Sequence, residues 1–383
     1  MSIDVIAGIA LAIWVYLITA RGGFWMGSVR DDSHPVEPSD WPAVTVVIPA
    51  RDEASLIGKS VSSLLDQNYP GPLSVIVIDD DSRDGTAEAA CRAARAGGPT
   101  LRIVRGQSLP PGWTGKLWAM KQGIVHAMAQ HPPPEFLLLT DADIAHAPDS
   151  VRWLVSHARA GGYTLVSLMA KLRCASLAER LHVPAFIYFF QMLYPFRWVA
   201  QAKSATAAAA GGCMLVRADA LSKAGGIDGI RHALIDDCAL AAKMKMVGPI
   251  WLGLTERAHS LRPYDDFTEV RHMISRSAYA QLRYSPWLLL GTTLAMLLVF
   301  VAPPALTVFA QGFARWLGLA AWVLMAVSFI PTLRSYRQSS LWAVALPAIA
   351  LIYTYYTLYS AYQHARRRGG QWKGRVQANA AGP

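Results

Sequence analysis

The segment VTVVIPARDE, residues 44–53, is a short β-branched run that ends in charged residues. The segment VIVIDDDSRDGT, residues 75–86, has the same pattern. Continuous apolar runs of this length are typical of strands that are buried on both faces. Each run is followed by apolar residues at helical spacing, in residues 55–67 and 86–96. The alternation of strand and helix predicts a parallel sheet with helices on both faces.

The same alternation continues further along the chain. More strands are predicted at residues 101–104, 136–139, 164–168 and 213–216, and more helices at residues 117–129 and 151–160. We therefore expect an α/β domain with a Rossmann-like, mostly parallel sheet over residues 41–285. In such sheets, ligands bind beyond the carboxyl ends of the strands.

Composition excludes several classes of protein. The 383 residues are 53% hydrophobic and 16% charged, with a net charge of +10 and a mean hydropathy of +0.26. Since soluble domains typically carry about 25% charged residues, this chain is poor in charge, and it is too apolar to be intrinsically disordered. The four cysteines are scattered and have no metal-ligand spacing, which excludes a disulfide scaffold: Cys91, Cys174, Cys213 and Cys238. We interpret them as small buried residues in a reducing compartment.

Apolar runs at both ends predict membrane helices. Residues 3–20 are almost uninterrupted apolar sequence, about the length that spans a bilayer. Arg21 follows this run instead of preceding it, which favours a retained transmembrane helix within residues 1–24 over a cleaved signal peptide. Three further runs predict about three C-terminal transmembrane helices in residues 286–363, before a basic tail at residues 364–383.

Basic residues give conflicting information on the orientation of these helices. Arg21 and Arg30 follow the first helix, so the domain should be cytoplasmic, in a multi-pass protein of the inner (cytoplasmic) membrane. Three C-terminal helices would then leave the tail outside, whereas its five basic residues favour the inside. The sequence therefore leaves the side of the tail open.

Residues 183–202 form a further apolar, aromatic stretch inside the domain. Pro184, Pro195 and Arg197 interrupt it, and a single span here would divide the domain between two sides of the membrane. We interpret the stretch as an interfacial or re-entrant helix, with an ordinary core helix as the alternative. Its aromatic residues are expected to form an apolar binding surface for the acceptor, with the candidates Tyr188, Phe189, Phe190 and Trp198.

Acidic residues follow three of the predicted strands. They lie in residues 49–53, in residues 79–86 and in residues 140–143, although the protein is basic overall. Asp, Ser and Thr at residues 79–86 are also what a helix N-terminus prefers, and Asp141 to Asp143 also fits a simple turn. Three acidic clusters at three strand ends are harder to explain by capping, so we predict a functional site at this edge of the sheet.

Crowded carboxylates favour a divalent cation. Oxygen ligands suit Mg²⁺ or Mn²⁺, which usually bridges protein carboxylates and substrate phosphates. Asp141 and Asp143 would point to opposite faces of a strand, so we expect them on a turn where both can serve one site. Residues 112–116, Gly-Trp-Thr-Gly-Lys before a helix, fit an anion cradle that includes Lys116, or a plain glycine turn.

These segments, in this order, resemble glycosyltransferase family 2, the inverting nucleotide-sugar transferases of the GT-A fold. VVIPARDE, VIVIDDDSRDGT, TDAD, AAAAGGCMLVRADALSKAGGID and LIDDCALA carry the resemblance, over about residues 41–285. PGWTGKLWAMKQG, LIDDCALA and MISRSAYAQLRYSP are together similar to the hopanoid-biosynthesis-associated (hopene-associated) membrane glycosyltransferases. The resemblance implies a nucleotide-sugar donor, a lipid acceptor at the membrane and a divalent cation, and no nucleic-acid partner.

The resemblance also implies roles for individual residues. Asp237 would be the catalytic base, with Asp236 beside it in place of the usual Glu, and Asp141 and Asp143 would hold the metal and the diphosphate. The donor-binding set implied is Pro49, Arg51, Asp52, Glu53, Asp79, Asp80, Lys116, Asp141, Arg276 and Arg283. Arg276 and Arg283 fit either the diphosphate or anionic lipid headgroups, since they lie just before the first C-terminal apolar run.

One departure from the family bears on the type of product. The family's Gln-x-x-Arg-Trp is represented only by Ala280-Gln-Leu-Arg-Tyr284, which lacks the leading Gln. This favours a single transfer over processive polysaccharide synthesis, which stays as the alternative. A sugar nucleotidyltransferase would need a Gly-rich loop after the first strand, where Pro49 to Glu53 stand instead. A non-enzymatic membrane scaffold would have no use for the acidic clusters.

Overall fold

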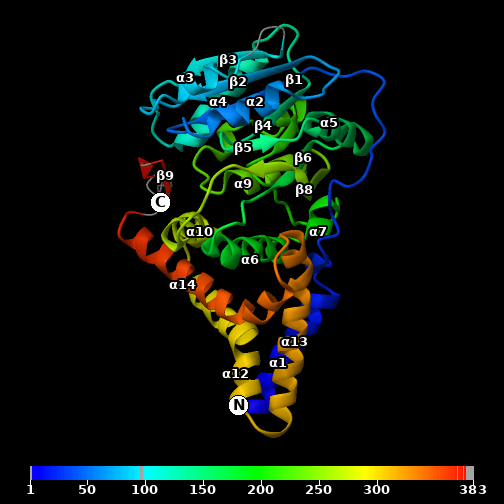
Figure 1. The fold of residues 1–383 in the computed structure, drawn as a ribbon, viewed down its shortest axis with the longest axis vertical. Helices are drawn as coiled ribbons and strands as arrows, with labels where there is room; N and C mark the ends of the chain where they lie inside the picture. Colours follow the sequence, from blue (N-terminus) through cyan, green and yellow to red (C-terminus); the bar gives the residue numbers. More distant parts are fainter. Residues whose placement is uncertain (1, 95–97, 369, 374, 377–383) are drawn as a thin grey trace. The chain divides into compact units, whose positions relative to one another are not determined.

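The computed structural model describes residues 2–94, 98–368, 370–373 and 375–376 (Figure 1). The chain forms two compact units. The sheet unit comprises residues 29–173, 198–263 and 371–383, and the helical unit comprises residues 1–28, 174–197 and 264–370. The domain predicted at residues 41–285 is therefore not one unit, because residues 174–197 and 264–285 pack with the terminal helices.

The sheet unit is built on an eight-stranded sheet in the order β3-β2-β1-β4-β7-β6-β8-β5. The strands are β1 Val44–Ala50, β2 Leu73–Asp79, β3 Thr100–Arg105, β4 Phe136–Leu139, β5 Ile144–His146, β6 Leu165–Lys171, β7 Met214–Arg217 and β8 Ile250–Ser260. Strands β1 to β4 run parallel to one another, and β6 runs parallel to β8. Strand β7 is antiparallel to β4 and β6, and β5 is antiparallel to β8.

The predicted mostly parallel sheet is thus confirmed, with two differences. The strand predicted at residues 213–216 exists as β7 but runs antiparallel, because an apolar run specifies burial and not direction. Strands β5 and β8 are absent from the sequence prediction. Strand β5 has only three residues, and the second half of β8 mixes buried with charged side chains, which weakens the apolar signal.

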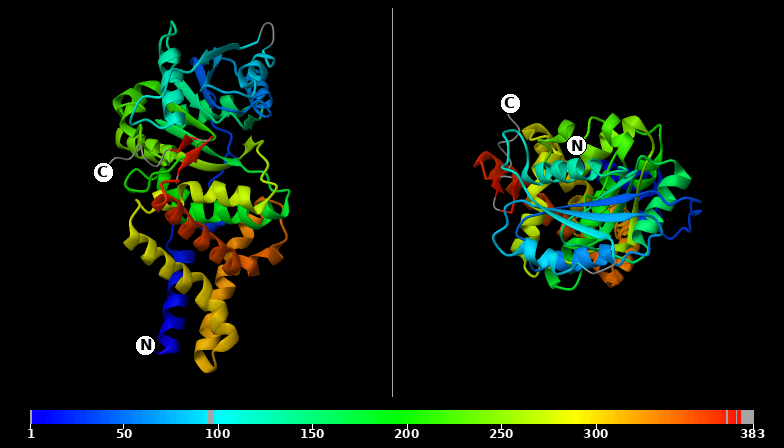
Figure 2. Two further views of the ribbon diagram at one scale, coloured as in Figure 1. Left: turned by 90° about the vertical axis from the view of Figure 1, so that its left-hand side faces the viewer. Right: turned by 90° about the horizontal axis from the view of Figure 1, so that it is seen from above.

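Helices cover both faces of this sheet, as predicted, and Figure 2 (right) shows them on either side of the strands. They are α2 Ile57–Leu65, α3 Thr86–Cys91, α4 Gly115–Met128, α5 Ser150–Gly161, α8 Ala218–Lys223 and α9 Asp236–Val247. Alternate residues of β1 serve opposite faces: Val46 and Ile48 pack in one buried cluster with α2, α3 and α5, whereas Val47 faces Gly123 of α4. Burial of successive residues on both faces explains why the strand is apolar throughout.

The close approach of α4 to β1 gives a stability prediction. A methyl group at Gly123 would overlap the side chain of Val47 and lie 3.2 Å from Ile78 Cγ1. Gly123→Ala should therefore destabilise the protein by about 1–3 kcal/mol through overpacking, although Ala favours a helix by about 1 kcal/mol. The matched control is Gly58→Ala in α2, where the added carbon meets only Ala89 O at 3.4 Å. Thermal unfolding of both variants in detergent should show a loss for Gly123→Ala alone, and equal midpoints would contradict this packing.

The helical unit contains the apolar segments from both ends of the chain. Its helices are α1 Ile3–Thr19, α6 Leu177–Leu193, α10 Phe267–Gln281, α11 Pro286–Met296, α12 Ala302–Phe309, α13 Gly312–Ser335 and α14 Leu346–Ala365, with a π-helical turn at Leu297–Val301 between α11 and α12. Among the residues that the structure describes, three continuous helical segments are long and apolar enough to cross a membrane: Pro286–Phe309, Gly312–Ser335 and Ser340–Ala365. The N-terminal helix α1 is shorter, with 17 residues.

The helix predicted at residues 183–202 is present with different bounds, as α6. It begins six residues earlier because Ser176 and Glu179 form a capping box. Pro184 lies inside the helix instead of interrupting it. The chain turns after Leu193, and a short helix α7, Phe196–Ala200, crosses the boundary between the two units.

Candidate active site

The carboxyl ends of β1, β2 and β4 meet at one edge of the sheet. Ala50 pairs with Asp79, and Val47 pairs with Leu139, so the loops at residues 51–56, 80–85 and 140–143 leave the same edge. The predicted gathering of the three acidic clusters is therefore confirmed.

The loops after β1 and β2 hold each other in place. Arg51 donates to the carbonyl of Asp80, and its guanidinium lies 3.6 Å from the Asp80 carboxylate, which is buried. The Asp52 carboxylate accepts from Arg83 N at 2.9 Å. Asp79 accepts from Ser82 N at 3.1 Å, so this carboxylate shapes its own turn. This bond forms a turn and not a helix cap, since the N-cap residue of α3 is Gly85, without a side-chain cap bond. Asp52 and Asp80 are held between the two loops.

Lys116 joins the donor side of the site to the expected catalytic acids. It lies in the first turn of α4, whose start is capped by the Thr114 hydroxyl. Its Nζ is 2.9 Å from Asp141 Oδ1 and 3.1 Å from Asp236 Oδ2. Burial alone would lower the pKa of Lys116, but Asp141, Asp236 and Asp237 outweigh it and raise that pKa. Lys116 is therefore a permanent cation that bridges two carboxylates almost 100 residues apart in sequence.

Asp237 is held by two backbone amides at the start of α9. Its Oδ2 accepts from Gly211 N at 3.0 Å, and its Oδ1 accepts from Cys238 N at 2.7 Å. Burial raises the pKa of Asp237 to about 6, and the neighbouring Asp236 adds to this, while Lys116 opposes it. A carboxylate with a pKa near 6 is ionised at neutral pH and is still basic enough to accept a proton late in a reaction.

The backbone around Gly211 is anchored to the end of β4. Thr140 Oγ1 donates to Gly212 O at 2.7 Å and lies 3.0 Å from His146 Nε2. Burial lowers the pKa of His146 to about 4, so this ring stays neutral at physiological pH. The residue that precedes the Asp141–Asp143 turn thus also positions the amide that binds Asp237.

Arg262 is a site residue that the sequence analysis missed. Its Nε lies 2.7 Å from Asp143 Oδ2, and its Nη2 lies 2.7 Å from Glu53 Oε2. Arg262 comes two residues after β8, which is parallel to β6, and Leu261 N donates to Asp143 O at 2.8 Å. Prediction of β8 as a strand would have placed Arg262 at the functional edge.

The carboxylates suit a cation that arrives with phosphates. Within the described ranges no three His, Cys, Asp or Glu side chains converge in a group that could hold a metal ion. Asp141 and Asp143 are each paired with a basic side chain, Lys116 or Arg262. Mg²⁺ and Mn²⁺ often use only one or two carboxylates and take their remaining ligands from substrate phosphates and water. The residues therefore fit a divalent cation that Asp141 and Asp143 would hold together with a diphosphate.

Five of the predicted site residues belong to the helical unit and not to the sheet unit. Arg276 lies on α10, Arg283 follows that helix, and Tyr188, Phe189 and Phe190 lie on α6. Tyr188 is fully buried, with its hydroxyl 2.7 Å from Ser328 Oγ, and Phe189 is buried in the same core. The expected apolar surface is therefore wrong for these two residues, because they pack inside the helical unit. Phe190, and Trp198 of the sheet unit, are half-buried.

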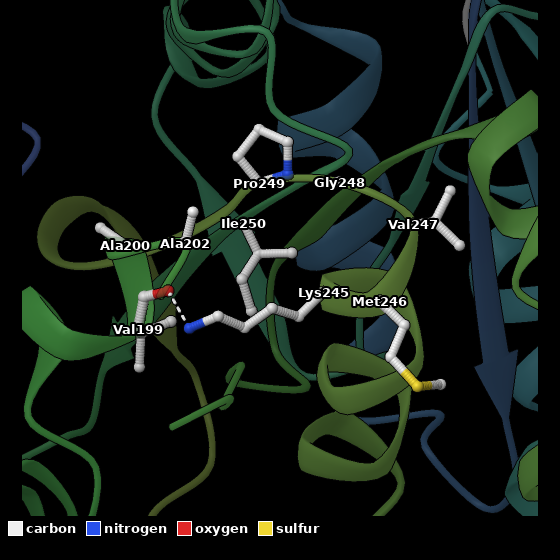
Figure 3. A pocket seen from close by; sticks show the side chains of 9 residues that line it. All are labelled: Val199, Ala200, Ala202, Lys245, Met246, Val247, Gly248, Pro249 and Ile250. Atoms are coloured by element: carbon white, nitrogen blue, oxygen red, sulfur yellow. Dashed lines mark hydrogen bonds between the residues drawn. The ribbon is translucent and has the colours of Figure 1, made fainter. Parts of the chain in front are cut away.

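A small hollow of about 220 Å³ lies elsewhere in the sheet unit (Figure 3). It is lined by residues 199–200, 202 and 245–250, none of which belongs to the site above. Lys245 of α9 enters it and donates to the carbonyls of Trp198, Val199 and Thr206, at 3.2, 2.9 and 2.6 Å. These bonds tie α9, which begins with Asp236 and Asp237, to the segment that leads toward Gly211.

Comparison with known sequences gives one family. The family described as "Glycosyltransferase like family 2" matches residues 42–254, more than half of the chain. An N-acetylglucosaminyltransferase of Rhizobium meliloti is 29% identical over 41% of this chain and 36% of its own length. A 4,4'-diaponeurosporenoate glycosyltransferase of Staphylococcus aureus is 35% identical over 30% of this chain and 28% of its own. The matched region thus spans about a third of the length of these curated relatives.

Comparison with solved structures agrees on the fold. Mannosyltransferase PcManGT from Pyrobaculum calidifontis, solved in complex with GDP-Man and Mn²⁺, covers 94% of this chain and 98% of its own, with a TM-score of 0.56 and 21% identity. At this identity the likeness concerns the fold. The PcManGT structure holds both a nucleotide sugar and Mn²⁺.

Proposed function

This chain belongs to glycosyltransferase family 2, and from that premise we propose that it transfers one sugar from a nucleotide-sugar donor to a lipid acceptor at a membrane, with inversion. The observation that carries the proposal is the bridge made by Lys116. It brings Asp141, on the donor side, and Asp236, next to the candidate base, within 2.9 and 3.1 Å of one ammonium group.

The site residues fit the two halves of an inverting transfer. On the acceptor side, Asp237 accepts the proton of the attacking hydroxyl, as a base oriented by Gly211 N and Cys238 N. On the donor side, Lys116 offsets the negative charge that grows on the leaving diphosphate. Asp141 and Asp143 would hold a divalent cation, which supplies further stabilisation of that charge when bound. Asp52 and Asp80, which the first two loops hold between them, bind the nucleoside in this proposal.

A membrane lipid is the acceptor that the composition favours. Three helical segments are long and apolar enough to cross a bilayer, which supports a multi-pass protein. Arg21 and Arg30 support a cytoplasmic sheet unit and a location in the inner membrane. A hopanoid acceptor is supported by the resemblance of the three segments quoted above. Phe190, Trp198, Arg276 and Arg283 are the remaining candidates for contacts with lipid or diphosphate.

The test is transfer of label into lipid. Membranes that contain the protein are incubated with Mn²⁺ and, one at a time, with radiolabelled UDP- and GDP-sugars, and label is measured in extracted lipid and in the insoluble polymer fraction. We expect one donor to label a lipid by a single sugar. Label that accumulates in polymer would replace the proposal with polysaccharide synthesis, and no transfer from any donor would contradict the activity.

The elevated pKa of Asp237 predicts an acidic limit to activity. Asp237 must be ionised to accept a proton, so kcat/KM should be level above pH 6 and fall about tenfold per pH unit below it. Because Lys116 lowers the pKa of Asp237, its removal in Lys116→Met should move this limit to higher pH. The measurement is kcat/KM for the donor between pH 4.5 and pH 8.

A neighbouring lysine provides the control for this shift. Lys121 lies on the same helix and pairs with Asp228 at 2.5 Å. Lys121→Met should leave the acidic limit where it is in the parent protein. An unshifted limit in Lys116→Met would mean that Asp237 is not the group that sets it.

A further inference from the structure

A lysine from the segment after α14 reaches the donor edge of the sheet unit. Residues 371–372 and 375–376 form a small antiparallel hairpin, β9 and β10, and Lys373 lies in its turn. The Lys373 Nζ is 2.7 Å from Glu53 Oε1 and donates to Asp52 O at 3.1 Å. The hairpin thus contacts the loop after β1, more than 300 residues away in sequence.

This contact completes a line of alternating charges. Lys373 pairs with Glu53, Glu53 pairs with Arg262, and Arg262 pairs with Asp143. Glu53 is buried, with 9% of its side chain exposed, so its charge requires partners. Two basic and two acidic groups cancel. Without Lys373 the line would carry a net negative charge at the edge where the diphosphate has to bind.

We infer that Lys373 is a positioning residue of the donor site, which neutralises Glu53 so that Arg262 is available to the diphosphate of the nucleotide. The inference rests on the proposed function, because it assumes a nucleoside diphosphate at this edge. Arg262 is shared between Glu53 and Asp143. Lys373 is a second cation next to Glu53, so it weakens the attraction between the Glu53 carboxylate and the Arg262 guanidinium. Lys373 itself acts through Glu53 and is not required to touch the sugar.

The contact also has a consequence for the side of the tail, which the sequence left open. Since residues 371–373 and 375–376 belong to the sheet unit, the chain that leaves this unit after residue 263 must cross any membrane an even number of times before residue 371. At least one of the three candidate spans therefore does not cross. Helix α14 is the candidate that does not cross the membrane in this inference, because it packs along α10. Ser360 Oγ accepts from Tyr279 N, and Arg271 lies over the Tyr359 ring. Residues 371–373 and 375–376 of the basic tail then lie on the side of the sheet unit, as the charge of the tail favours.

The first test measures nucleotide binding by the full-length protein in detergent. GDP and UDP are titrated separately with Mn²⁺ by calorimetry into the parent protein, Lys373→Met and Lys373→Arg. We expect Lys373→Met to weaken binding of the preferred nucleotide about tenfold, which is the order of effect for a residue that acts through a ligand-binding neighbour. Lys373→Arg keeps the charge and should stay near the parent affinity. In turnover, Lys373→Met should raise the KM for the donor and leave kcat nearly unchanged.

Arg368→Met is the matched control, because it removes one exposed positive charge from the same tail. It should bind nucleotide as the parent does. Parent-like affinity of Lys373→Met would overturn the inference and leave the proposed function intact, whereas a parent that binds neither nucleotide would overturn both. Equal melting temperatures of Lys373→Met and the parent would show that the loss of nucleotide affinity does not come from unfolding. A loss of kcat with unchanged KM for the donor would also overturn the inference.

The second test examines the side of the tail. In a background without native cysteines, Cys91, which is exposed in the sheet unit, is restored in one protein, and Arg368→Cys is introduced in another. Both are treated in intact cells, and after permeabilisation, with a maleimide that does not cross membranes. We expect both to become reactive only after permeabilisation. Labelling of the residue 368 cysteine in intact cells, with Cys91 protected, would overturn the return of the hairpin to the sheet unit.

Discussion

Asp237→Asn should lower the turnover of sugar transfer by about 10²–10⁴, the usual contribution of a general base. Nucleotide affinity should stay close to that of the parent, because Asn has the same size and keeps one acceptor oxygen for Gly211 N or Cys238 N. The expected loss is in kcat, since the carboxylate acts on the acceptor proton and not on the donor. Single-turnover transfer and calorimetry with the nucleotide measure the two quantities separately.

Asp219→Asn is the control for this change. Asp219 is an exposed acid in α8 of the same unit, paired with Arg217 at 2.5 Å and Lys223 at 3.2 Å, and it lies outside the site. Its variant should retain full turnover. A loss of nucleotide affinity in Asp237→Asn that matches its loss of turnover would assign Asp237 to the donor site instead.

Asp143→Ala should nearly abolish transfer, with a loss of about 10²–10³ or more, as for removal of a group that stabilises transition-state charge. The change removes a candidate metal ligand and leaves Arg262 paired only with Glu53. Loss of the candidate metal ligand should outweigh the release of Arg262 from one carboxylate, so the variant should lose nucleotide affinity as well as turnover. Asp141→Ala should act similarly, because Asp141 is the other candidate ligand for the divalent cation. Mn²⁺-dependent nucleotide binding and transfer are the measurements.

Asp149→Ala provides a matched control, because Asp149 is also paired with an arginine, Arg257, at 3.0 Å, away from the site. It should leave nucleotide binding and transfer unchanged. Excess chelator should stop transfer by the parent protein and restore it when Mn²⁺ is added back. Full turnover in chelator would rule out the divalent cation, and parent-like nucleotide affinity in Asp143→Ala would remove Asp143 from the donor site.

Much of the sheet unit could be predicted because the information is local. Strand β4 and the central residues of β1 and β2 are buried on both faces and are mostly apolar, so each strand appears in the sequence as a nearly continuous run. Parallel strands joined by helices place their carboxyl ends at one edge, so the acidic residues after these strands had to gather there. The resemblance to the family added the role of Asp237, which has no local signature beyond a helix start.

The rest required the tertiary structure, because it depends on contacts between distant segments. A run of apolar residues indicates that a strand is buried but not in which direction it runs. The direction of β7 is therefore known only from its antiparallel pairing with β4 and β6. Tyr188 has the same aromatic character in a lipid-binding surface and in a core, and only packing against Ser328 decided between them.

The sequence by itself determined the buried strands, the gathering of their acidic ends and the apolar helices, since each follows from the residues of one segment. Only the tertiary structure decided how the charges of that edge are paired. Arg262 and Lys373 look like ordinary surface cations in the sequence, and they become site residues because Glu53 and Asp143, which follow other strands, lie within hydrogen-bonding distance of them. Ion pairs act over a few ångströms in space and leave no periodic pattern along the chain, so the folded arrangement alone reveals them.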